Sequence, residues 1–170
     1  HSNASPFPSG RPPDQNCSGY RALSGMFRRK TPPPTLPPEW MIVGLGNPGP
    51  TYAGTRHNVG FNVIELLAER ARIRLNQRKH QAVFDVVPVN GVPCVLVKPM
   101  TFMNLSGQAV APLLRSYNLG PEHLIVIADE LDLEVGDAKF TASGGAGGHN
   151  GHRSLIGSLG TKEYARIKIG

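Results

Sequence analysis

The chain has 170 residues, with 18 Lys and Arg against 12 Asp and Glu, 20 glycines, 16 prolines and two cysteines. Its length fits one domain, and no apolar run approaches the roughly 20 residues of a membrane-spanning helix. Two cysteines are too few for a disulfide-stapled scaffold, which favours a reducing compartment. The net charge of +6 suits an anionic partner but does not identify one.

The first 40 residues differ in composition from the rest of the chain. They contain nine of the 16 prolines and carry five basic and two acidic residues, a net charge of +3. A proline-rich run such as residues 31–38 forms neither a helix nor a central strand, and few large apolar side chains are available for burial. We therefore expect residues 1–40 to be a disordered Pro-rich tail or a targeting segment, and residues 41–170 to be the folded domain.

The remaining residues alternate between strand and helix patterns. Asn90-Gly91 is the pair that a two-residue hairpin turn prefers, and Ser106 is a candidate N-cap. The predicted elements are a strand over 40–45, a helix over 59–71, hairpin strands over 82–89 and 92–97, a helix over 107–117, a buried strand over 124–128, a strand over 138–142, a helix over 150–159 and a strand over 164–169. They predict a single α/β domain whose mixed, twisted sheet is covered by helices on both faces.

A glycine pattern after the first strand resembles a dinucleotide-binding motif but lacks its context. Residues 44–49 satisfy G-x-G-x-x-G, yet Pro48 and Pro50 interrupt the path into a helix, which begins only near Asn58. The acidic residues about 20 positions later lie inside that helix and not at the end of a second strand. We therefore interpret the glycines as a tight turn. Nucleotide binding is an alternative function that we do not expect.

Polar side chains gather where the predicted strands end, which is where α/β sheets place their ligands. Asn47 follows the first strand, Asn104 follows the hairpin, Asp129 follows the buried strand, and Asn150 opens a helix after a glycine-rich loop. His57 precedes the first helix. An imidazole can accept a proton from water near neutral pH, a carboxylate can fix its tautomer, and carboxamides can orient water or substrate.

Each of these residues also has a structural explanation when it is considered alone. His57 suits a helix cap or a surface, Asp129 suits a turn, Asn104 suits a turn, and Asn150 suits an N-cap. Their shared position at strand ends is what favours a hydrolytic site. A nucleophilic cysteine is less favoured because Cys94 lies within a strand. His149 and His152 are spaced as a helical metal pair, but no further ligand motif accompanies them, so we prefer a site without metal.

Four blocks of this sequence together resemble the bacterial-type peptidyl-tRNA hydrolases, which also occur in eukaryotes. The blocks are residues 42–49 with 52–61, residues 98–107, residues 129–132 and residues 144–151. The resemblance covers essentially all of residues 41–170. It implies an enzyme, a carboxylic ester hydrolase that cleaves peptide from the 3′ ribose of tRNA and recycles tRNA for translation. It further implies a monomer without metal or organic cofactor and without an obligate protein partner.

The resemblance also implies a role for individual residues. His57 is the expected catalytic base and Asp129 is its carboxylate partner. Asn47 and Asn104 are expected to position the peptidyl end and the water, and Asn150 the substrate near the tRNA 3′ end. Tyr52 and His149 are expected nearby as further substrate-binding residues.

This sequence departs from the family at the positions where side chains are expected to bind tRNA phosphate. Thr141 stands where a basic residue is common, which leaves Lys139 as the nearest cation, and Lys168 replaces a common arginine without its bidentate fork. The family also continues beyond the position of Gly170, so we expect a C-terminally truncated eukaryotic member. The alternative hypothesis is an inactive isoform or fragment that retains at most tRNA binding. The cytoplasm and the mitochondrion both remain open as its location.

Overall fold

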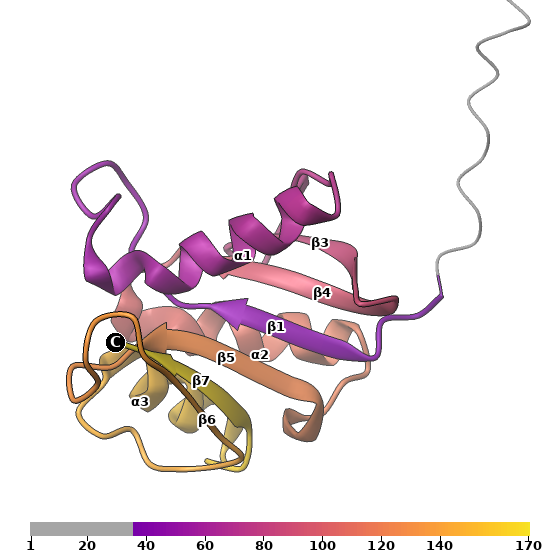
Figure 1. The fold of residues 1–170 in the computed structure, drawn as a ribbon. Helices are drawn as coiled ribbons and strands as arrows, with labels where there is room; N and C mark the ends of the chain where they lie inside the picture. Colours follow the sequence, from indigo (N-terminus) through magenta and orange to yellow (C-terminus); the bar gives the residue numbers. More distant parts are fainter. Residues whose placement is uncertain (1–35) are drawn as a thin grey trace, which may run out of the picture. The chain divides into compact units, whose positions relative to one another are not determined.

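A seven-stranded mixed sheet organises residues 36–170, the part of the chain that the computed structural model describes (Figure 1). The predictions for residues 1–35 lie outside this range. The strands are β1 (Trp40–Gly44), β2 (Gln77–Lys79), β3 (Ala82–Val89), β4 (Val92–Pro99), β5 (Leu124–Asp129), β6 (Ala138–Thr141) and β7 (Ala165–Ile169). The helices are α1 (Val59–Arg70), α2 (Ser106–Ser116) and α3 (Asn150–Leu159), with short 3-10 turns η1 (Arg56–Asn58), η2 (Met103–Leu105) and η3 (Pro121–His123).

The strand order is β2-β3-β4-β1-β5-β7-β6. The four strands β4, β1, β5 and β7 run parallel, whereas β2 and β3 on one side and β6 on the other pair antiparallel with their neighbours. The predicted hairpin is confirmed, since Asn90 and Gly91 join β3 to β4 with φ values of 48° and 79°. The carboxyl ends of the parallel strands consequently lie along one edge of the sheet.

Helices cover both faces of this sheet, as predicted (Figure 1). Met41 and Val43 of β1 contribute to the core that contains residues of α2 and α3, whereas Ile42 belongs to the core that contains residues of α1. This alternation along β1 is the period of two that a strand imposes on its side chains. The central strand is therefore buried on both faces, and its carboxyl end is held firmly in place.

Two glycines let α1 pack closely against the end of β1. A Cβ atom on Gly44 would overlap the carbonyl group of Gly60, and one on Gly60 would overlap the backbone of Leu45. The close approach of helix and strand, and not a turn alone, explains Gly44 in the rejected dinucleotide motif. Since His57 lies just before α1, this contact brings it beside the end of β1.

Two details differ from the sequence predictions. β2 was not predicted because its three residues, Gln77–Lys79, are all polar and exposed, so they carry no hydrophobic period. Ser106 does not cap α2, because it lies inside the helix and its hydroxyl donates to the carbonyl of Met103 (2.8 Å). None of the helices between residues 36 and 170 is long and apolar enough to cross a bilayer.

Candidate active site

A cleft of about 480 Å³ lies at the carboxyl ends of β1 and β5. Five residues predicted for the site line it, namely Asn47, His57, Asp129, His149 and Asn150. They come from the loop after β1, from η1, from the end of β5 and from the start of α3. The structure therefore brings together residues that are up to 103 positions apart in the sequence.

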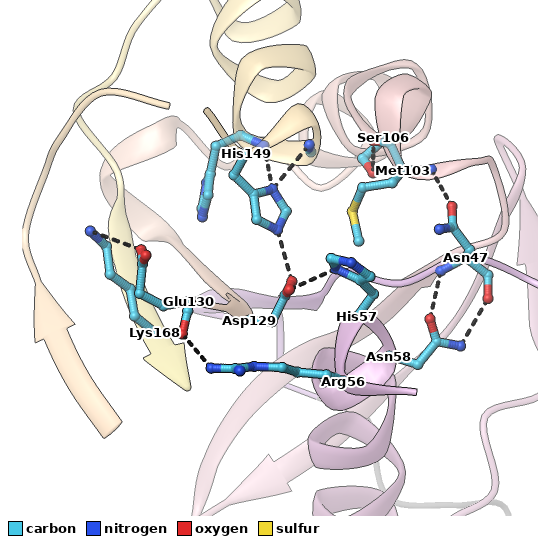
Figure 2. Close-up of polar contacts among 12 residues, drawn as sticks. Asn47, Arg56, His57, Asn58, Met103, Ser106, Asp129, Glu130, His149 and Lys168 are labelled. Carbon is cyan, nitrogen blue, oxygen red and sulfur yellow. Dashed lines mark hydrogen bonds and ion pairs between the residues drawn. The ribbon is translucent and has the colours of Figure 1, made fainter. Parts of the chain in front are cut away.

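Asp129 is the buried centre of the cleft, and two histidines bind its two carboxylate oxygens (Figure 2). Its Oδ2 lies 2.7 Å from His57 Nδ1, its Oδ1 lies 2.9 Å from His149 Nε2, and its side chain is only 2% exposed. Burial by itself raises the pKa of Asp129. The hydrogen bond from His149 and the charges of His149 and His57 outweigh it, so the pKa of Asp129 lies below its ordinary value. The carboxylate is therefore ionised at neutral pH.

His149 has both ring nitrogens engaged by the protein. Its Nδ1 accepts hydrogen bonds from the backbone N–H groups of Gly151 (3.1 Å) and His152 (3.4 Å), which makes His149 the N-cap of α3. Because Nδ1 accepts, the ring proton must be on Nε2, which donates to Asp129. Asn150, the alternative N-cap considered above, is the first residue of the helix instead.

Residues 36–170 hold His57 through one ring nitrogen only. Its Nδ1 faces the carboxylate of Asp129, and its side chain is 59% exposed. The ionised carboxylate selects the tautomer with a proton on Nδ1, which leaves a lone pair on Nε2. The geometry therefore supplies a general base that can take a proton from a water molecule in the cleft.

Asn47 is held by two neighbouring elements, through its carboxamide and through its backbone (Figure 2). Its Oδ1 accepts a hydrogen bond from the backbone N–H of Met103 (2.6 Å), and its Nδ2 is a donor that has no partner among residues 36–170. The buried side chain of Asn58 accepts from the backbone N–H of Asn47 (2.8 Å) and donates to its carbonyl (2.9 Å). This pair fixes the loop after β1 against the start of α1.

Arg56 connects η1 to the loop after β5. Its Nη2 donates to the carbonyl of Glu130 (2.9 Å) and to that of Leu133 (3.2 Å). Glu130, Leu131 and Asp132 line the cleft, so Arg56 fixes one of its borders. Arg56, Asn58 and the Met103 N–H were missed as site residues. Asn58 had one usable signal, because it directly follows His57 at a helix start.

The remaining predicted residues lie outside the lining of the cleft. Tyr52 is half-buried in the loop before η1, and Asn104 is exposed within η2. Lys139 is exposed on β6 and pairs in register with Lys168 on β7, whose Nζ lies 3.8 Å from Glu130 Oε2. The structure shows their places, and their roles stay predictions.

The alternative chemistries find little support in this geometry. Cys94 is buried within β4, where burial raises the pKa of its thiol. His149 and His152 are close, but the nitrogens of His149 already bind Asp129 and the start of α3. Within residues 36–170, no three His, Cys, Asp or Glu side chains come together as a possible metal site.

Comparisons with known proteins agree with this geometry. Residues 41–170 match the family model for peptidyl-tRNA hydrolase. A peptidyl-tRNA hydrolase of Alkaliphilus metalliredigens is 50% identical over 131 residues, which span 77% of this chain and 71% of the relative. One of Frankia alni is 46% identical over 137 residues, spanning 81% of this chain and 70% of the relative.

A solved structure gives the same result for the fold. The peptidyl-tRNA hydrolase of Acinetobacter baumannii superimposes with a TM-score of 0.74 at 38% identity, covering 80% of this chain and 70% of that protein. The family match, the sequence relatives and the shared fold therefore agree with one another. The chain belongs to the peptidyl-tRNA hydrolase family.

Proposed function

We propose that this cleft hydrolyses the ester bond between a peptide and the 3′ ribose of tRNA, releasing tRNA for reuse in translation. Membership of the family and the names of its relatives support the reaction. One observation carries the mechanism: Asp129 holds His57 through Nδ1 at 2.7 Å, so that Nε2 has an unshared lone pair at the cleft. In this proposal one chain supplies every catalytic group and acts as a monomer.

The reaction starts with a water molecule between His57 and the ester carbonyl. Nε2 takes one proton from this water while its oxygen attacks the carbonyl carbon. The charge of Asp129 stabilises the imidazolium that forms. When the tetrahedral intermediate collapses, the bond to the 3′ oxygen of the ribose breaks and the imidazolium returns its proton to that oxygen. The products are a free peptide carboxyl group and a tRNA 3′ hydroxyl.

The carboxamides are proposed to position the substrate. Asn47 Nδ2 is the donor described above, and it can bind the ester carbonyl as negative charge develops on its oxygen. Asn150 also lines the cleft and is proposed to contact the 3′ end of the tRNA. Asn104 is proposed to help Asn47 position the peptidyl end and the water, and Tyr52 is proposed as a further substrate-binding residue.

Lys139 and Lys168 are proposed to contact a tRNA phosphate. The two residues lie directly opposite each other on the antiparallel strands β6 and β7, so their side chains share one face. Replacing both with Gln is expected to raise the KM for peptidyl-tRNA and to make log KM less dependent on log salt by up to about 0.7–0.9 per lost contact. Lys79→Gln on β2, at the opposite edge of the sheet, is the control. An unchanged salt dependence in the double variant would contradict this role.

The hydrolytic function is tested by following the release of labelled peptide from peptidyl-tRNA. The 170-residue chain should hydrolyse the ester, and His57→Asn should lower kcat by about 10²–10⁴-fold because the general base is lost. The matched control is His80→Asn in the turn between β2 and β3, where φ is 53° and Asn is well tolerated. Full activity of His57→Asn would contradict the mechanism, and substrate binding without any hydrolysis by the unaltered chain would contradict the function.

A further inference from the structure

Three polar side chains are buried behind His149, and the mechanism above does not use them. His152 is 4% exposed, Tyr164 is 1% exposed and Arg166 is fully buried. They lie on α3, just before β7 and within β7, and none of them lines the cleft. Burying such groups costs free energy unless they gain partners, and apolar side chains would fill the same space without that cost. The groups that these three side chains contact therefore indicate which part of the structure they hold in place.

Arg166 clamps the glycine-rich loop before α3. Its Nη1 donates to the carbonyl of Gly145 (2.6 Å), and its Nη2 donates to the carbonyls of Gly144 and Lys162 (3.2 Å to Lys162). None of the ion pairs within residues 36–170 involves it, so its two Nη atoms bind carbonyl oxygens in place of a carboxylate.

The clamped loop is rich in glycine and reaches the cleft. Residues 144–148 contain four glycines, which have more backbone freedom to lose than other residues. Gly147 and Gly148 line the cleft and lead directly into His149. The planar guanidinium fork can fix two adjacent carbonyls at once, which a lysine ammonium cannot do as rigidly.

Tyr164 and His152 continue the contact from Arg166 to His149. The guanidinium carbon lies 4.3 Å from the centre of the Tyr164 ring, and the Tyr164 hydroxyl is 2.8 Å from His152 Nδ1. The centre of the His152 ring is 5.0 Å from that of His149, which binds Asp129. Burial, with the charges of His149, Arg166 and Lys168, lowers the pKa of His152 to about 3, so this ring is neutral at physiological pH.

We propose that Arg166, Tyr164 and His152 are positioning residues of the active site. Arg166 acts through residues 144–148 on the part of the cleft that Gly147 and Gly148 line. Tyr164 and His152 act through the His149 ring on Asp129, and thereby on the catalytic base. The inference rests on the proposed function and deepens it. Since a displacement of about 1 Å can cost about 10²-fold in rate, the two paths predict separable kinetic effects.

Two conservative variants and a matched control test the proposal. Arg166→Lys keeps the charge but loses the fork, and we expect about a tenfold rise in KM for peptidyl-tRNA with a smaller change in kcat. Tyr164→Phe keeps the ring under the guanidinium but removes the hydroxyl, and we expect kcat to fall about three- to tenfold at an unchanged KM. Arg153→Lys makes the same exchange at an exposed position of α3 and should change neither constant by more than about twofold.

Amide hydrogen exchange gives a readout that does not depend on activity. In Arg166→Lys the amides of residues 144–148 should exchange at least about tenfold faster, while those of β1 and β5 keep their protection. Unchanged KM and unchanged loop exchange in a folded Arg166→Lys would overturn the clamp. A lower Tm with unaltered kinetic constants would show that the cluster serves packing only, which also overturns the proposal.

The remaining outcomes also decide the question. If Arg166→Lys does not fold, Tyr164→Phe decides alone, and a kcat within twofold of the unaltered chain would overturn the proposal. If the unaltered chain hydrolyses no peptidyl-tRNA, the proposed function fails. The loop exchange of Arg166→Lys against Arg153→Lys then still shows whether Arg166 holds the loop.

Discussion

The two walls of the cleft meet at Asp129 but hold their histidines in different ways. The first wall, formed by Asn47, His57 and Asn58, presents a ring that is 59% exposed and bonded through Nδ1. The second wall, formed by Gly147, Gly148 and His149, presents a ring that is 17% exposed and bonded through both nitrogens. Only a ring with an unshared lone pair can accept a proton from water. The number of bonded nitrogens therefore separates a candidate base from a support, although both rings bind the same carboxylate.

Removing the carboxylate of Asp129 disrupts the contacts with the histidines of both walls and has the largest expected effect on kcat. Asp129→Asn presents an amide in place of two acceptor oxygens, so one histidine faces an N–H donor and loses its bond. We expect kcat to fall by about 10³-fold or more, because neither the tautomer nor the imidazolium of His57 is then stabilised. Steady-state hydrolysis of peptidyl-tRNA measures this. Asp132→Asn is the control, since Asp132 is an exposed cleft residue, and equal losses in the two variants would contradict the assignment.

Replacing the two histidines one at a time should have different effects on kcat and on Tm. His57→Asn removes the proposed base, whereas His149→Ala removes a bond to Asp129 and the cap of α3 but leaves the base in place. We expect kcat of His149→Ala to fall by about 10–10²-fold, less than for His57→Asn. Loss of a helix cap to alanine costs about 1 kcal/mol, so the Tm should fall mainly in His149→Ala. A larger kcat loss in His149→Ala than in His57→Asn would reverse the proposed roles.

The sequence predicted the shared carboxylate better than the bonds around it. Asp129 was recognisable because a charged residue ends an apolar strand, and α3 and both hairpin strands were placed closely by their periodicity. His149 was expected only near the substrate. Its bond to Asp129 depends on the path of the glycine loop, and that path is set by contacts with Arg166, which follows more than 15 residues later. No local sequence pattern predicts a contact between residues so far apart in the chain.

Asn58 shows a similar limit on the first wall. Its two hydrogen bonds reach the backbone of Asn47, and the close packing of Gly44 against Gly60 brings the two segments together. Ser106 was assigned wrongly as a cap because its residue type fits both positions, and only the structure shows its hydroxyl bonded to Met103. Residue type and spacing therefore predicted which groups take part, while tertiary packing decides which atoms meet.

A smaller change on the first wall tests whether Asn58 supports Asn47. Asn58→Ala leaves the N–H and carbonyl of Asn47 without their partners, which should lower the free energy of unfolding by about 1–3 kcal/mol and the kcat by about tenfold. Asn62→Ala removes an exposed side chain from α1, the helix that follows Asn58, and should change both by little. Urea unfolding and hydrolysis assays measure the two effects. Wild-type kcat in Asn58→Ala would show that Asn47 is positioned without it.

The last prediction concerns stability and comes from His152, whose ring packs against His149 of the second wall. The pKa of His152 is lowered to about 3 in the folded protein, mainly by burial and also by His149, Arg166 and Lys168, while Asp129 opposes the shift. Between pH 6.5 and 3 the unfolded chain binds a proton that the folded protein does not. The free energy of unfolding therefore falls as the pH drops through this window, by at most about 1.4 kcal/mol per pH unit from this group.

His152→Leu isolates that contribution. Urea unfolding between pH 7 and 4.5 should give a flatter pH dependence for the variant than for the unaltered chain. Asp129, whose pKa is lowered, keeps its contribution above its ordinary pKa and loses it only at more acidic pH, outside this range. His80→Asn, which changes a turn residue far from the cluster in the sequence, should keep the original dependence. Parallel curves for His152→Leu and the unaltered chain would show that His152 does not stay neutral in the fold.

The tautomers of the two histidines test the central claim most directly. Nitrogen-15 NMR of the histidine rings at about pH 8, with assignments from His57→Asn and His149→Ala, reports which nitrogen carries the proton. The difference between the walls predicts opposite tautomers, with the proton on Nδ1 in His57 and on Nε2 in His149. A proton on Nε2 of His57 would remove the lone pair that activates water and would contradict the mechanism.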